Sequence, residues 1–172
     1  MENITYNAPA AIRIGHIHLK VADLDRSIKF YRDIMGFDLL VNVAGAAFLS
    51  AGGYHHHIGL NTWHSEGKGP APKHAAGLYH FALNYPTKCD LARAVKRLKD
   101  MNYPLRGASD HTTHLAIYLN DPDGNGIELA WDRDPNYWTF LTSGNVDLNK
   151  LKNANKFLDI EALIEEAEPE VN

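Results

Sequence analysis

Three consecutive histidines, His55 to His57, separate a Gly-Gly pair from an apolar run in the segment AGGYHHHIGLNTW. The charge of an imidazole changes near neutral pH, so each of these side chains could move protons, and each could also bind a metal. If the segment is an extended strand, alternation places His57 and Gly59 on one face and His56 on the other. The sequence therefore predicts different tasks for neighbouring histidines, with His55 and His56 as structural or rim residues.

Two segments with the same order of expected elements could position such side chains. The first, IRIGHIHLKVADLDRSIKFYRDIMGFDLL, has the pattern of a strand and then a helix that Asp23 or Asp25 caps and Gly36 ends. The second, GLYHFALNYPTKCDLARAVKRLKDMNYPL, repeats this order, and its helix begins at Thr87 or Asp90. Short strands follow each helix, and the last one contains IGL or IEL shortly before a tryptophan. Such an internal repeat predicts an α+β fold built from two βαβββ modules.

The modules are expected at about residues 12–63 and 78–133, within one domain of residues 12–133. The segment between them, HSEGKGPAPKHAAG, is rich in Gly, Pro and Lys, which predicts a mobile linker or lid. Residues 134–172 form a C-terminal extension. Its polar composition predicts one short surface helix and a frayed acidic end.

The composition excludes several classes of protein. A net charge of −4 over 172 residues gives no basic face for nucleic acid. The apolar runs are too short to span a bilayer, and the N-terminus lacks the pattern of a secretion signal. The single cysteine, Cys89, excludes an internal disulfide framework and favours the cytoplasm.

The repeat and two of its segments, GHIHLKVADLDRSIKFYRDIMGF and YLNDPDGNGIEL, resemble the vicinal oxygen chelate superfamily. That superfamily includes glyoxalase I, extradiol dioxygenases, fosfomycin-resistance enzymes and bleomycin-binding proteins. The segments AAFLSAGGYHHHIGLNTW and GLYHFAL look most like catechol 2,3-dioxygenase-like members. The resemblance covers about residues 12–133 and implies that the two modules pair into a half-open barrel around one divalent metal.

The family carries its metal ligands on the first and last strands of its modules. Here this implies His16 and His80 on the first strands and Glu128 on the last strand. Two neutral imidazoles and one carboxylate suit Fe(II), with Mn(II) or another divalent metal as the alternative. These residues could instead be ordinary polar core residues, but an unpaired buried carboxylate is costly, so metal binding is favoured.

Alignment of the two final strands places Gly59 where Glu128 lies in the second module. Glyoxalase I-like members have a carboxylate at this first-module position and thus four protein ligands. Its absence here favours a dioxygenase, because a dioxygenase needs open coordination positions for substrate and oxygen.

Three further residues match the dioxygenase pattern. His57 resembles a non-ligand histidine that moves protons between substrate and oxygen, although it could simply fill space. Tyr118, ten residues before Glu128, resembles the active-site tyrosine. His111 resembles a substrate-binding histidine, and His114 competes for that role.

The resemblance implies extradiol cleavage of a catechol-type aromatic, with dioxygen as the second substrate, as in aromatic catabolism. A glyoxalase-like isomerase or lyase is the second candidate. A non-enzymatic binding protein of the bleomycin-resistance type is the third, although such proteins lack the metal triad. Familiar extradiol enzymes often have two paired-module domains, so a homodimer could complete the pocket.

Overall fold

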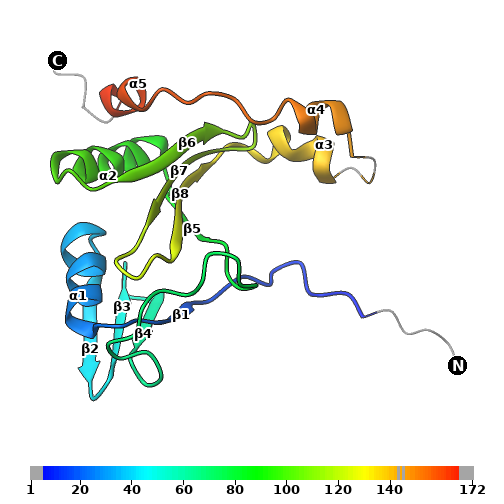
Figure 1. Ribbon diagram of the computed structural model, residues 1–172. Coiled ribbons are helices and arrows are strands. Elements are labelled where there is room, and N and C mark those ends of the chain that lie inside the picture. Colours follow the sequence, from blue (N-terminus) through cyan, green and yellow to red (C-terminus); the bar gives the residue numbers. More distant parts are fainter. Residues whose placement is uncertain (1–5, 143, 145, 167–172) are drawn as a thin grey trace, which may run out of the picture.

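The computed structural model describes residues 6–142, 144 and 146–166, which form two modules of the same order (Figure 1). The first module contains β1 (Ile17–Lys20), α1 (Leu24–Lys29), the π-helical turn η1 (Phe30–Ile34), β2 (Asp38–Val43), β3 (Ala46–Ser50) and β4 (Ile58–Asn61). The second contains β5 (Phe81–Asn84), α2 (Lys88–Asp100), β6 (Leu105–Asp110), β7 (His114–Asn120) and β8 (Gly126–Asp132). Residues 64–77, between the modules, form turns without a helix or strand.

Each module builds one four-stranded mixed sheet. The strand orders are β1-β4-β3-β2 and β5-β8-β7-β6, so the first strand of each module pairs in parallel with its last strand. Within the described residues no strand pair joins the two sheets, and neither sheet closes into a barrel. The α+β fold of two βαβββ modules is thus confirmed.

The predicted helix signals act as expected. The Asp23 side chain caps α1 by accepting a hydrogen bond from the Arg26 amide, and Thr87 caps α2 in the same way through the Asp90 amide. Gly36 follows the first helical segment with a φ of +84°, a left-handed conformation that a side chain would oppose. Of the two candidates for each helix start, the structure selects Asp23 and Thr87, and Gly36 ends the first helical segment as predicted.

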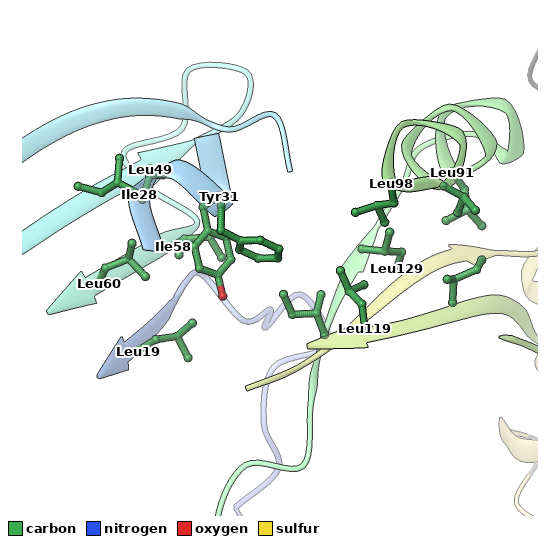
Figure 2. Close-up of a cluster of buried hydrophobic side chains, with 14 of the residues drawn as sticks. Leu19, Ile28, Tyr31, Leu49, Ile58, Leu60, Leu91, Leu98, Leu119 and Leu129 are labelled. Atoms are coloured by element: carbon green, nitrogen blue, oxygen red, sulfur yellow. The ribbon is translucent and has the colours of Figure 1, made fainter. Parts of the chain in front are cut away.

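One hydrophobic core runs through both modules (Figure 2). The apolar side of α2 packs Leu91 and Leu98 toward Leu129 of β8, while Ile58 and Leu60 of β4 face the first helix. Tyr31 lies between these two groups and is completely buried. Its position makes it a direct packing link between the modules.

The turn between β7 and β8 joins the modules by polar contacts and reaches toward α1 (Figure 1). Asp123 accepts hydrogen bonds from the Ala22 amide at 3.0 Å, Arg26 at 2.6 Å and the Ser27 hydroxyl at 3.2 Å. The buried Tyr31 hydroxyl donates to Asp121 at 3.0 Å. Burial, and then the Asp121 carboxylate, raise the pKa of Tyr31 well above its ordinary value. The turn therefore fixes the second module against the first helix.

The C-terminal extension contains more structure than the sequence predicted. Instead of one surface helix, it forms the 3-10 turn η2 (Pro135–Trp138), α3 (Thr139–Thr142), α4 (Leu148–Lys152) and α5 (Ile160–Glu165). Leu163 of α5 is buried against the core, and Lys99 of α2 pairs with Glu161. The single-helix prediction was wrong because caps at Asp147 and Asp159 start separate short helices. The frayed acidic end that the sequence predicted falls partly at 167–172, outside the described residues.

The described helices are all short. None of those in the described ranges is long and apolar enough to cross a membrane.

Candidate functional site

Glu128 lies in the middle of β8 and is only 5% exposed. Its Oε2 atom is 2.9 Å from Nε2 of His80, the residue immediately before β5. Its Oε1 atom is 3.0 Å from Nε2 of His114, the first residue of β7. Strand pairing on both sides of β8 brings these groups together, because β5 is the parallel neighbour and β7 the antiparallel one.

The surroundings of Glu128 favour its ionised form. The hydrogen bond with His114 lowers the pKa of Glu128, and the nearby imidazoles add to this effect, while burial acts in the opposite direction. The net direction is downward, so the carboxylate carries its charge at neutral pH. An anionic oxygen and an imidazole nitrogen are both ligands that Fe(II) and Mn(II) accept.

The 2.9 Å separation between His80 Nε2 and Glu128 Oε2 also suits a shared metal. Two ligand atoms at right angles, each about 2.1 Å from a metal, are about 3 Å apart. His80 and Glu128 lie together, and both their chemistry and their spacing fit the predicted metal.

Tyr118 lies opposite Glu128 in the β7–β8 register. Its hydroxyl is 2.7 Å from Nε2 of His111, and its ring centroid is 5.7 Å from that of His80. Burial and the Glu128 carboxylate raise the pKa of Tyr118 to about 12, so its hydroxyl keeps its proton at neutral pH. The predicted tyrosine and histidine thus form a hydrogen-bonded pair beside Glu128.

His111 and His114 both line this cluster, in different places. Their rings stack with centroids 4.7 Å apart, but His111 contacts Tyr118 while His114 contacts Glu128. Burial, followed by the proximity of His114, lowers the pKa of His111 and favours its neutral form. The two histidines are therefore not alternatives for a single position.

An ion pair holds the turn that carries His111. Arg133 donates to both carboxylate oxygens of Asp110 and to the carbonyl oxygen of Thr112. Asp110 also accepts from the Thr112 amide, at a residue whose φ is +68°. These contacts support an uncommon backbone conformation next to the candidate site.

His16, the third predicted ligand, lies in the first module immediately before β1. Its ring centroid is 4.4 Å from that of His56 and 6.2 Å from that of His55. Within the described ranges, no contact joins it to His80 or Glu128, and no three potential ligand side chains form a group able to hold a metal. The structure thus assembles two of the predicted ligands and leaves His16 beside the histidine triplet.

The histidines of the triplet, His55 to His57, do not lie in a strand, so their side chains do not point alternately to the two faces of the sheet. β4 begins only at Ile58, and residues 51–57 form turns. His56 lies against Phe48, with ring centroids 5.0 Å apart, and Phe48 is the strand partner of Gly59. The expectation that His56 faces away from Gly59 is wrong, because the alternation of a strand does not extend into the turn.

His57 makes its own local contacts. Its Nδ1 atom is 3.1 Å from the Ser50 hydroxyl and accepts a longer bond, 3.3 Å, from the Ala51 amide. No hydrogen bond or ring contact links it to His80 or Glu128 in the part of the chain that the structure describes.

The sequence indicated only a substrate-binding role for His114 and did not predict its contact with Glu128. A signal was present, since His114 and Tyr118 are four positions apart in one strand and so share a face. If Tyr118 faces Glu128, His114 must lie on the same side of the sheet.

Comparisons with known proteins agree with this fold. A catechol-2,3-dioxygenase of Bacillus subtilis is 46% identical over 111 residues, which is 63% of this chain but 37% of that protein. A probable lactoylglutathione lyase of Vibrio parahaemolyticus is 34% identical, over 70% of this chain and 91% of that protein. This chain thus spans little more than a third of the first relative and most of the second.

A solved structure and a family model give the broader assignment. The crystal structure of a glyoxalase/dioxygenase from Nostoc punctiforme superposes with a TM-score of 0.60 at 23% identity, over 76% of this chain and 98% of that one, and supports the fold alone. The family model matches residues 13–129, which include the first module, most of the second and all three predicted ligands. The chain therefore belongs to the Glyoxalase/Bleomycin resistance protein/Dioxygenase superfamily.

Proposed function

We propose that this protein is a metal-dependent extradiol dioxygenase that cleaves the ring of a catechol-type aromatic. The observation that carries the proposal is the buried Glu128 carboxylate, which lies 2.9 Å from His80 and beside the Tyr118–His111 pair. The similarity to a catechol-2,3-dioxygenase supports it.

His80 and Glu128 would hold the metal. His16, which lies beside His56 in the structure, is proposed as the third ligand because its place immediately before β1 matches that of His80 before β5. Fe(II) is the favoured ion, with Mn(II) as the alternative. When bound, such a metal supplies the positive charge that favours an ionised catechol and the electron transfer that dioxygen requires. Glu128 contributes the only anionic ligand of this set.

The remaining residues would orient the substrate and move protons. Tyr118 is protonated at neutral pH, so its hydroxyl can donate a hydrogen bond to a catechol oxygen. In that arrangement Nε2 of His111 would donate to the Tyr118 oxygen, and Nδ1 of this histidine, whose pKa is lowered, would be the nitrogen that accepts a proton or a hydrogen bond. His57 is proposed as a further proton-transfer residue. Its Nδ1 atom is held by Ser50 and Ala51, which leaves Nε2 as the nitrogen available for exchange.

A glyoxalase-like isomerase is the second candidate. It is favoured by the probable lactoylglutathione lyase, because this chain covers 91% of that relative. The Gly59 position weighs against it, since no carboxylate is present there to complete a four-ligand set.

Oxygen uptake tests the proposed function. The protein is purified anaerobically and loaded with Fe(II) or Mn(II). Catechols of increasing ring substitution are then supplied, and oxygen consumption is followed together with the absorbance of the ring-opened product. Metal-dependent uptake in the parent and its loss in His80→Ala are expected. The matched control is Glu66→Gln, an exposed carboxylate in a turn between the two modules, which should behave as the parent.

Two results would reject the dioxygenase. One is a metal-replete parent that consumes no oxygen with any catechol. The other is metal-dependent isomerisation of the methylglyoxal–glutathione adduct without oxygen uptake, which would establish the isomerase instead.

A further inference from the structure

The two oxygens of Glu128 have different partners. Oε2 faces His80 at 2.9 Å, whereas Oε1 faces His114 at 3.0 Å. One oxygen of the carboxylate is thus directed to His80, a predicted metal ligand, and the other is bound by His114.

The protonation of His114 follows from its neighbours. A carboxylate oxygen can only accept a hydrogen bond, so Nε2 of His114 carries the proton and donates to Oε1 of Glu128. In the neutral ring Nδ1 must then accept, and the Thr113 hydroxyl at 2.8 Å is the donor. Thr113, His114 and Glu128 thus form a chain of hydrogen bonds with a defined direction.

The packing around His114 keeps its ring in place. His111 stacks on it with an interplanar angle of 27°, and the His114 side chain is 26% exposed. A partly buried ring with partners at both nitrogens and a stacked neighbour has little rotational freedom.

We propose that His114 is a positioning residue: it binds Oε1 of Glu128 and so presents Oε2 alone, beside His80, as the metal-binding oxygen. The inference rests on the proposed metal site and adds a residue that the expected ligand set does not contain. Hydrogen-bonding partners of metal ligands fix ligand orientation, and their loss commonly weakens metal binding by about 10- to 100-fold.

The test compares His114→Leu with His114→Gln. Leucine removes the N–H donor, whereas the glutamine amide can place a donor near the position of Nε2. The affinity of each protein for Mn(II) is measured by competition with a chelator, which needs neither substrate nor turnover. Affinity should fall about 10- to 100-fold in His114→Leu and stay within a few-fold of the parent in His114→Gln.

A second variant keeps the test informative if His114→Leu does not fold. Thr113→Val retains the imidazole but removes the donor to Nδ1, so a smaller loss of Mn(II) affinity is expected. Thermal unfolding of the metal-free proteins reports folding separately from metal binding.

Three outcomes would overturn the inference. Parent-like affinity in His114→Leu would show that Glu128 needs no such partner. Equal losses in His114→Leu and His114→Gln would indicate that the imidazole itself is a ligand. Unchanged affinity in His80→Ala would remove the metal site on which the inference rests. By contrast, His80-dependent Mn(II) binding without oxygen uptake would reject the dioxygenase function alone.

Discussion

The imidazole of His18 lies so close to Gly59 that a Cβ atom at residue 59 would be 2.9 Å from Cγ of that ring. The two residues are strand partners in the β1–β4 pair. In the second module the equivalent partners are Ala82 and Glu128. The large and small side chains are thus exchanged between the modules: the first module has an imidazole on its first strand and a glycine on its last, where the second has an alanine and the carboxylate.

Gly59→Ala should therefore destabilise the protein through this contact. The His18 ring would have to move, at a cost of about 1 kcal/mol or more in the free energy of unfolding. Denaturant unfolding of both single variants and of His18→Ala/Gly59→Ala measures the coupling, and the double variant should regain most of the loss. Additive effects would show that the ring moves freely and does not exclude a side chain.

The histidine triplet gives a second prediction. His57→Gln should leave Mn(II) content nearly unchanged and lower turnover by about 100-fold, as expected for the loss of a proton-transfer group. His56→Gln is the comparison: it alters the neighbouring ring, which packs against His16 at 4.4 Å, and it should lower turnover much less. Metal content and oxygen uptake are measured on both proteins. A larger loss of turnover in His56→Gln would assign the role to His56, and loss of metal in His57→Gln would make His57 a ligand.

Local signals in the sequence predicted the modules and much of the cluster around Glu128. Capping residues and apolar stripes act over a few residues. The two helices that begin after Asp23 and Thr87 could therefore be identified without a structure. The choice of His80 and Glu128 as candidate ligands followed from the internal repeat and the family resemblance, and the structure places their side chains 2.9 Å apart.

Features that depend on distant contacts could not be predicted in the same way. The attachment of the DPDGNG segment to α1 joins residues about 100 positions apart, as in the Ala22–Asp123 hydrogen bond. The facing of His56 depends on where β4 begins, and strand boundaries are the least certain part of any pattern. The position of His114 required both strand alternation and the register of β7 on β8.

The attachment of this turn to α1 should contribute strongly to stability. Asp123→Ala removes a largely buried carboxylate that accepts hydrogen bonds from Ala22, Arg26 and Ser27. Because hydrogen bonds to charged groups are strong, the free energy of unfolding should fall by about 2–3 kcal/mol. Asp25→Ala, at an exposed position in the first turn of the same helix, controls for the general loss of a carboxylate near α1.

Denaturant unfolding at neutral pH measures the free energy of unfolding of both variants and of the parent. The control should lose only about 0.3–1 kcal/mol through the helix dipole. Equal losses in both variants would mean that Asp123 acts only as a charge near the helix and not as a link between modules.

The Asp110–Arg133 pair predicts a dependence of stability on pH. The hydrogen bond with Arg133 is the main cause that lowers the pKa of Asp110 to about 2, and Asp110 is only partly exposed. A carboxylate with a depressed pKa stabilises the fold above its unfolded value, near 4, and this contribution is lost as the pH falls toward 2. Asp110→Asn should therefore cost about 1–2 kcal/mol at pH 7, and its difference from the parent should shrink between pH 4 and pH 2. Urea unfolding at pH 7, 4 and 3 measures this difference, with Asp100→Asn, an exposed aspartate at the end of α2, as the baseline for removing one carboxylate. A difference between Asp110→Asn and the parent that stays constant from pH 7 to pH 3 would show that the ion pair does not stabilise the fold.

Because the Asp110–Arg133 pair supports the turn before His114, Arg133→Gln should also lower turnover through displacement of His111.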